Sequence, residues 1–444
     1  MIERPVPVVL FLMAISVCAH MIYFGFTRAA LQKPIYGPFN GAAQALVESH
    51  FNAIWSPTTT MGENIARREP AYTFFLASTY LILGNSWGAV AFTLSVVCGL
   101  VSIMVFLIGS QLFSYRVGFL ASVWVIIYPY YFLQGSPPNI YETMLFTFFL
   151  LLSVWSLLRM QVNLTVKDSI ITGVLLGLAA LCRPNVLFVL PLTLVWFFFT
   201  SSAPLQKQVW LVISLILAFM MTLVPWALRN SVVEGVFSPF GLYGNQNIYK
   251  AFHPVILEYY LGEGAFADPK LRSLSSDRVY EQAPLWDAEQ TRGMTTYEVD
   301  AWRRSMPWRY WSQHPIQFVK LTALKVIALW SWKLEPLTLS WVKQAVYAVS
   351  YVPVLILGVM GFWLQRDKWR QTSLFLTLFL SFTLFSAVTY GVTRYRAPID
   401  AYLIIMASVS VVYLIQLLFG FSLFFFREKY KTILDLIKIG EHYG

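Results

Sequence analysis

Long apolar runs, separated by short polar segments, are repeated along most of this 444-residue chain. A helix needs about 20 consecutive apolar residues to cross the hydrocarbon layer of a bilayer. We therefore expect transmembrane helices at 7–26, 87–112, 117–134, 140–158, 168–182, 186–200, 208–227, 343–363, 372–391 and 399–420. The first run is too long for the core of a signal peptide and has no small-residue cleavage site, so we expect it to be retained.

The stretch 317–333 fits the pattern less well, because Lys320 and Lys325 stand among its aliphatic residues and tryptophans. That mixture is typical of an amphipathic helix at the membrane surface as well as of a span. Counting it as a span would reverse the direction of every later helix. We therefore interpret it as interfacial.

Composition agrees with a polytopic membrane protein, because 57% of the residues are hydrophobic and only 12% are charged. Soluble domains carry about 25% charged residues. The net charge of +10 does not indicate nucleic-acid binding, since the basic residues are scattered over short loops. The cysteines and histidines show neither a disulfide framework nor metal-ligand spacing. A divalent cation held by carboxylates and a substrate phosphate stays open.

Charge also predicts the orientation and the domain organisation. Basic residues of the short loops fall on one side of the predicted topology, which is then the cytoplasm. They are Lys167, Lys207, Arg366, Lys368, Arg370, Arg427, Lys429 and Lys431. The expected parts are a membrane module 1–227 with a first outer loop 27–86, an outer loop region 228–342, membrane helices 343–426 and a cytoplasmic tail 427–444.

The opposite, outer side of the predicted topology also carries arginines, although the positive-inside rule predicts few basic residues there. They are Arg68, Arg183, Arg229, Arg394 and Arg396. A fixed guanidinium suits an anion, above all phosphate, which it binds bidentately. Arg394 and Arg396 flank Tyr395, so an extended backbone would turn both toward one phosphate, with Asp400 as their ion partner. The alternatives are that this pair anchors a helix end and that Arg229 extends to the interface.

Several stretches occur in the order found in one family. They are 68–77 (REPAYTFFLA), 141–143 (YET), 177–184 (GLAALCRP), 224–230 (VPWALRN) and 394–398 (RYRAP). With them the chain resembles, over about residues 40–400, the GT-C fold class of membrane glycosyltransferases. It is most similar to the bacterial protein mannosyltransferase and lipid A aminoarabinose transferase family. The resemblance implies an all-α fold with about 10–12 transmembrane helices and helical loops at the outer face.

The resemblance also implies an activity. Such enzymes move one sugar, a hexose or a pentose, from a polyprenyl phosphate to a hydroxyl group, with inversion. The acceptor is a glycan, a lipid or a secreted protein such as a pilin. The site would face the periplasm from the bacterial cytoplasmic membrane. A donor of this kind needs no nucleotide-binding loop, and the chain has none.

The family places its catalytic base, an acidic residue, in the first outer loop. The position where an Asp is usual holds Asn40, which cannot act as a base. The remaining candidates are Glu69, then Glu63, then Glu48. Glu69 leads because it follows Arg68 directly before an apolar segment. Its alternative role is that of an acid in the first turn of a helix, where it favours the helix dipole.

Further residues are expected to orient the substrate. Glu142 opens the fourth expected span, where a first-turn acid is the alternative interpretation. Asn40 and Tyr395 complete this group. Arg183 stands at a tight bend between two short apolar segments, and we interpret it as a phosphate contact.

Two other functions stay open. A polymerase or ligase of lipid-linked glycans is compatible with the large late loop 228–316, which holds ten of the 22 acidic residues. A transporter of lipid-linked glycans would show inverted repeats and polar residues near the midplane of the membrane. The sequence displays neither feature.

Overall fold

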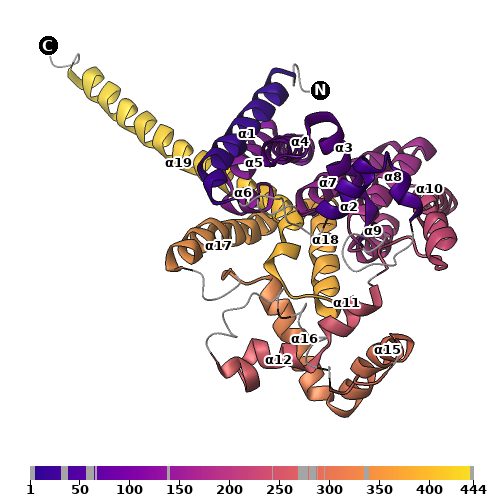
Figure 1. The fold of residues 1–444 in the computed structure, drawn as a ribbon. Coiled ribbons are helices and arrows are strands. Elements are labelled where there is room, and N and C mark those ends of the chain that lie inside the picture. The colour runs from indigo at the N-terminus through magenta and orange to yellow at the C-terminus, as the bar shows by residue number, and fades with distance from the viewer. Residues whose placement is uncertain are drawn as a thin grey trace.

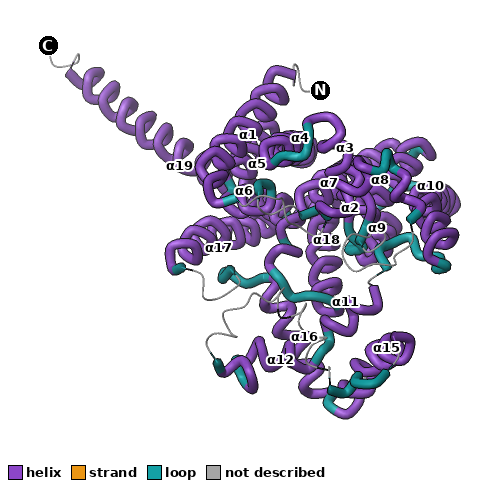
Figure 2. Tube along the Cα trace, in the orientation of Figure 1, coloured by secondary structure: helices purple, strands orange, loops and turns teal. Residues whose placement is uncertain are grey.

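The computed structural model describes residues 6–31, 39–56, 65, 68–137, 141–242, 244–268, 279, 287, 289–294, 296–334 and 340–440. These residues form helices and connecting loops and contain no strand (Figure 2). The long helices gather in one bundle, and shorter helices from the second half of the chain lie together at one side of it (Figure 1). The expected all-α class is confirmed.

Each of the expected spans is helical. They correspond to α1 (Val6–Thr27), α4 (Trp87–Leu112), α5 (Tyr115–Ile127) with α6 (Pro129–Gln134), α7 (Thr143–Asn163), α8 (Val166–Cys182), α9 (Val186–Thr200), α10 (Leu205–Glu234), α17 (Trp341–Leu364), α18 (Trp369–Val388) and α19 (Ala397–Gly440). Within the described residues, seven helices are long and apolar enough to cross a membrane. The fold is that of a polytopic membrane protein.

The structure differs from the expected ranges at three places. The run 117–134 is broken at Tyr128, because Pro129 disfavours a helical backbone in the residue before it. An additional short apolar helix, α3 (Pro70–Leu83), precedes α4. Helix α19 continues through residue 427, where the sequence suggested a separate tail, and its last part extends away from the bundle (Figure 1).

Two glycines allow α8 and α10 to approach closely. A Cβ atom at Gly173 of α8 would collide with the carbonyl of Leu215 in α10, and one at Gly177 would collide with Thr222. Both contacts advance in the same direction along the two helices, so α8 and α10 run parallel. Small residues at such crossings are typical of helix packing in membranes. The close crossing holds the C-terminal part of α8 against α10.

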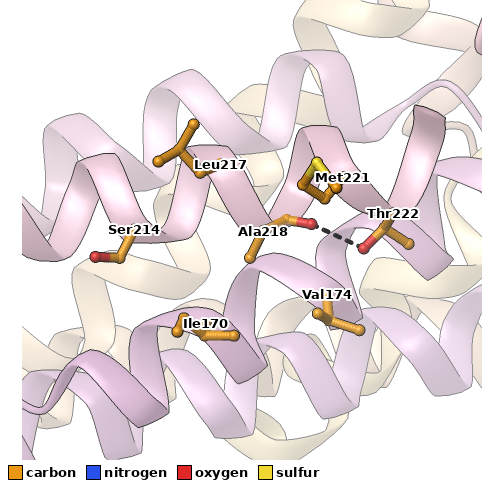
Figure 3. Close-up of a pocket in the computed structure, with 7 residues that line it drawn as sticks. All are labelled: Ile170, Val174, Ser214, Leu217, Ala218, Met221 and Thr222. Atoms are coloured by element: carbon orange, nitrogen blue, oxygen red, sulfur yellow. Dashed lines mark hydrogen bonds between the residues drawn. The ribbon is translucent and has the colours of Figure 1, made fainter.

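The outer side of the α8–α10 pair carries a shallow apolar groove. Its walls are formed by Ile170 and Val174 from α8 and by Leu217 and Met221 from α10 (Figure 3). The hydroxyl groups of Ser214 and Thr222, which also line the groove, donate to main-chain carbonyls of α10 at 2.8 Å, so both donor hydrogens are engaged within the helix. Exposed aliphatic side chains of this kind are typical of a surface that faces lipid.

The bundle has two distinct ends. Gln161 in the last turns of α7 donates to Thr200 at the end of α9 (3.0 Å), and Trp196 near that end donates to Ser373 at the start of α18 (3.0 Å). These contacts bring the basic loops around Lys167 and 366–370 to one end. The starts of α7, α9 and α19 and the ends of α8 and α10 therefore lie at the other end.

Beside this second end lie α11 (Gly244–Ala251), α12 (Pro254–Leu261), α15 (Thr296–Gln313) and α16 (Pro315–Leu329). The carboxylate of Asp287 connects α11 to the start of α12 by accepting from the Tyr249 hydroxyl and, at 3.0 Å, from His253 Nε2. Burial raises the pKa of Asp287 to about 6 and lowers that of His253 to about 4. Buried apolar residues of this region, among them Phe252, Ile256 and Trp311, form a cluster separate from the core of the bundle. Helix α16 has 15 residues and is not among the seven long spans. Its interfacial position stays a prediction.

Candidate functional site

The centre of the site is a buried ion pair between the end of α8 and the start of α7. Arg183 Nε lies 2.6 Å from Glu142 Oε1, and the two residues are 2% and 7% exposed. Arg183 leaves the helix with an extended backbone (φ −154°, ψ 135°), because Pro184 follows it. Buried charges are costly unless they are paired, so the two opposite charges compensate each other in this pair.

The pair stands among buried polar atoms that have no hydrogen-bond partner in the described part of the chain. They are Glu142 Oε2, Thr143 Oγ1, both Nη atoms of Arg183, and Oδ1 and Nδ2 of Asn185. Such atoms are rare in folded proteins, since leaving one unpaired costs about 1–3 kcal/mol. Several of them on adjoining residues make this place a candidate ligand site.

Glu69 is the second carboxylate of the site. It is half-buried directly before α3, and burial raises its pKa to about 7. The charge of Glu142 adds to this effect, while Arg68 and Arg183 oppose it. Burial acts on Glu142 in the same direction, but the attraction of Arg183 and Arg394 outweighs it and lowers the pKa of Glu142. One carboxylate is thus held ionised, and the other changes its protonation state near neutral pH.

The start of α19 completes the site through Arg394 and Tyr395. The Cζ atom of Arg394 lies 4.3 Å from the centre of the Tyr141 ring, and Cζ of Arg183 lies 4.6 Å from that of Tyr395. The Tyr395 ring also stacks on Tyr390 with 6.1 Å between the ring centres. The rings orient the guanidiniums by cation–π contacts, and both Nη atoms of Arg183 have no hydrogen-bond partner among the described residues.

Residues 393–395 form a 3-10 helix, so the expected extended stretch is wrong. The main-chain N–H of Arg396 donates to the carbonyl of Thr393 at 2.9 Å and leads into α19, which has Pro398 in its first turn. Arg394 and Arg396 therefore have different surroundings. They do not form the joint clamp that the alternating pattern predicted.

Arg396 is completely buried and holds helices together. Its Nε donates to Asp400 at 3.0 Å, which confirms the expected ion partner for this arginine. Nη1 donates to the carbonyls of Leu329 and Ser331 at 3.1 and 3.0 Å, and Nη2 donates to the Tyr347 hydroxyl. Both ends of the guanidinium are engaged within the protein.

Arg229 has a similar role at the end of α10. Its Nε donates to the carbonyl of Ile54 at 2.6 Å and Nη2 to that of Ser56 at 3.1 Å, while Nη1 lies 2.9 Å from Glu234. These contacts tie α10 to the 3-10 helix Asn52–Trp55 of the first loop. Arg68, by contrast, is exposed.

Asn40 connects two elements of the first loop. It begins α2 (Asn40–Glu48), is buried, and accepts a 2.6 Å hydrogen bond from the Tyr80 hydroxyl of α3. Glu48 is exposed at the other end of α2. Glu63 lies outside the described residues. Of the three predicted base candidates, Glu69 is the one with a neighbourhood of charges described around it.

Three buried residues were not expected from the sequence. Asn185 follows the Arg-Pro bend, and Tyr72 lies one helical turn after Glu69, with its ring centre 5.0 Å from that of Phe39. Lys325 of α16 is fully buried, with Nζ 3.8 Å from the centre of a phenylalanine ring. The position of Asn185 beside Arg183 was the one available signal. Among the described residues, no three His, Cys, Asp or Glu side chains lie close enough to hold a metal ion.

The arrangement of the helices is that of the GT-C fold. Archaeal oligosaccharyltransferase AglB from Archaeoglobus fulgidus, in complex with an inhibitory peptide and a dolichol-phosphate, matches with a TM-score of 0.56 and 13% identity, over 93% of this chain and 51% of that chain. The apo form matches with a TM-score of 0.55 and 12% identity, over 93% and 51%. The chain spans about half the length of these relatives, and at this identity they show the fold alone.

A protein-family model matches part of the chain. Residues 67–227 match dolichyl-phosphate-mannose-protein mannosyltransferases, and this segment contains Arg68, Glu69, Glu142 and Arg183. No curated protein matches the chain. The chain is thus a membrane protein of the GT-C fold, and the matched segment supports a glycosyltransferase, as the resemblance implied.

Proposed function

We propose that the protein transfers one sugar from a polyprenyl-phosphate donor to a hydroxyl group of an acceptor. The observation that carries this proposal is the meeting of Glu69, Glu142 and Arg183 at one end of the bundle, within the segment that matches the mannosyltransferase family. A carboxylate that ionises near neutral pH and a set of guanidiniums supply the two things that this transfer needs.

In the proposed reaction the acceptor oxygen attacks C1 of the sugar while the bond from C1 to the phosphate oxygen breaks. The electron pair of that bond leaves with the phosphate. The hydroxyl proton passes to the carboxylate of Glu69, which later releases it to water. The products are the glycosylated acceptor and polyprenyl phosphate, and attack from the side opposite the phosphate inverts C1.

Arg394 and the two Nη atoms of Arg183 are assigned to the departing phosphate, with Arg68 at the exposed edge of the site. Their charge stabilises the negative charge that develops as the bond breaks. Glu142 holds Arg183 in position and remains ionised. Arg229 and Arg396 are assigned to structural roles, because their guanidiniums are engaged by carbonyl and carboxylate oxygens.

We also propose that this end faces outward from a bacterial cytoplasmic membrane. The basic loops around Lys167, Lys207 and 366–370 support this orientation, since such loops remain in the cytoplasm. The helical loop region beside the site is the proposed place for the acceptor, whether a glycan, a lipid or a secreted protein. The apolar surface of the bundle receives the polyprenyl chain.

Transfer by the purified protein in lipid nanodiscs tests the proposal. A panel of polyprenyl-phosphate hexoses and pentoses is offered with glycan, lipid and pilin-type peptide acceptors, with and without EDTA. The wild type should transfer a single sugar, and Glu69→Gln should lose at least about 100-fold in rate, as expected for a general base. Absence of transfer from every donor would refute the function. Growth of a repeating glycan would favour a polymerase instead.

A further inference from the structure

Asn185 occupies a position that helix capping does not explain. Asparagine often precedes a helix, where its side chain accepts from main-chain N–H groups. Here the side chain makes no such bond to α9, although the main-chain carbonyl of Asn185 accepts from Phe188 at 3.0 Å. The side chain is nevertheless buried, with the residue 1% exposed. Its position therefore has another cause.

Both polar atoms of this amide have no hydrogen-bond partner among the described residues. An amide offers two donor hydrogens and one acceptor oxygen. Thr143 Oγ1 and Glu142 Oε2 likewise have no hydrogen-bond partner among the described residues. The Glu142–Arg183 ion pair holds together the two chain segments that carry these atoms. The cluster thus presents donors and acceptors together, on residues held by a buried contact.

The charge of this cluster selects the kind of ligand. Arg183 and Glu142 neutralise each other at 2.6 Å, and Asn185 and Thr143 carry no charge. Beside Glu142 Oε2, Thr143 and Asn185 an anion is disfavoured by the carboxylate oxygen, and a cation by the neighbouring guanidinium, whose own Nη atoms are assigned to the phosphate. A neutral group that both donates and accepts satisfies all of these atoms, and the hydroxyl groups of a sugar ring have this property.

We propose that Asn185, together with Thr143 and Glu142 Oε2, binds hydroxyl groups of the donor sugar and determines which sugar is accepted. The proposal deepens the proposed function and rests on it. Arg394, whose Cζ atom lies 4.3 Å from the centre of the Tyr141 ring, and the Nη atoms of Arg183 are assigned to the phosphate of the donor, so Asn185, Thr143 and Glu142 Oε2 are left for its sugar ring. Bare polyprenyl phosphate makes no use of Asn185.

Binding, measured without reaction, tests this assignment. The wild type in nanodiscs is titrated with polyprenyl phosphate and with polyprenyl-phosphate mannose, glucose, galactose, N-acetylglucosamine and 4-amino-arabinose. It should bind at least one sugar-bearing lipid more tightly than the bare lipid. Asn185→Ala should reduce that preference about tenfold, the effect of one or two lost hydrogen bonds. Its affinity for bare polyprenyl phosphate should change less than about twofold by the same reasoning.

A matched control is Gln208→Ala. Gln208 is also a buried amide, but it donates to the carbonyl of Ala203 at 2.7 Å at the start of α10, at the opposite end of the bundle. This variant should keep the full preference. Should Asn185→Ala fail to fold, deoxy sugars on the wild type provide the same comparison. Removal of the bound hydroxyl should weaken binding about tenfold.

The outcomes separate the two proposals. A wild type without preference for any sugar-bearing lipid, or an Asn185→Ala variant that weakens bare and sugar-bearing lipids equally, overturns the assignment of Asn185. The assignment is also refuted if transfer occurs and the variant keeps its preference. If the wild type prefers one sugar-bearing lipid through Asn185 but transfers no sugar, the proposed function fails and the sugar site stands.

Discussion

The guanidinium of Arg183 bonds the carboxylate of Glu142 through Nε alone, at 2.6 Å from Oε1. A bidentate contact would engage both edges of each group. The single contact leaves both Nη atoms and Oε2 without partners among the described residues. The pair thus fixes the orientation of both side chains and keeps hydrogen-bonding capacity for a substrate.

The first prediction concerns the stability of this pair. Arg183→Ala leaves a buried, uncompensated carboxylate, and it should lower the free energy of unfolding by about 3–5 kcal/mol. Glu142→Gln should destabilise the protein for the same reason. The double variant should recover part of the loss but none of the transfer activity. Thermal unfolding in detergent measures the stability of each variant, and transfer assays measure its activity. Additive losses in the double variant would contradict a coupled pair.

The second prediction concerns pH. Because burial raises the pKa of Glu69 to about 7, its base form is scarce in acid and increases as the pH rises through 7. The transfer rate at low substrate concentration should follow this increase. The raised pKa also means that the folded state binds the proton more tightly than the unfolded state. Stability from this group is present below its ordinary pKa of 4.5 and is lost as the pH rises through about 7.

Glu48→Gln is the control for Glu69→Gln, since Glu48 is an exposed carboxylate of the same loop. It should retain wild-type transfer at every pH. Glu69→Gln should remove both the activity and the pH dependence of stability assigned to this residue. A pH profile that stays flat from 5 to 8, or an active Glu69→Gln variant, would exclude Glu69 as the base.

The third prediction separates two neighbouring arginines. Arg396→Ala removes bonds to Asp400, to the Leu329 and Ser331 carbonyls and to a tyrosine, so it should destabilise the fold by about 3–5 kcal/mol. Arg394→Ala should cost less stability than Arg396→Ala, because Arg396 is fully buried and bridges Asp400 to main-chain carbonyls of distant residues. It should instead weaken binding of polyprenyl phosphate about tenfold or more. Equal effects of the two variants on lipid binding would show that the division of roles is wrong.

The fourth prediction concerns Asn40. Its side chain accepts from Tyr80, so Asn40→Ala leaves a buried hydroxyl without its partner and should cost about 1–3 kcal/mol. Tyr80→Phe should lose a comparable amount. The transfer rate per folded molecule should persist in both, since Asn40 provides no base. A complete loss of transfer in folded Asn40→Ala would show that this residue contacts the substrate.

The helices were predictable because apolar runs have few alternatives in a membrane. Each expected span is helical, and the break at Pro129 follows from a local rule that the long run concealed. The contacts of the arginines were harder to predict from the sequence. Arg183 and Arg396 are both flanked by apolar residues in the sequence, yet one has unpaired edges and the other is saturated. That difference depends on carbonyls of Leu329 and Ser331, more than sixty residues away in the chain.

The partner of Glu142 illustrates the same limit. Its position before an apolar run indicated the start of a helix correctly, but a start of this kind is equally typical of an acid that only favours the helix dipole. Arg183, at the far end of the next helix, pairs with Glu142, and this contact places Glu142 at the centre of the candidate site. Asn185 was hidden for a different reason: an asparagine before a helix is so common that it gives no signal.

The ring of Tyr395 connects the candidate site with the helical loop region. On one side it supports Arg183, and on the other it stacks on Tyr390, whose hydroxyl donates to Asn247 of α11 at 3.0 Å. A shift of α11 in the loop region therefore tilts the surface on which the Arg183 guanidinium rests. Under the proposed function, an acceptor that displaces α11 would shift the ring beneath Arg183 and so change the binding of the donor.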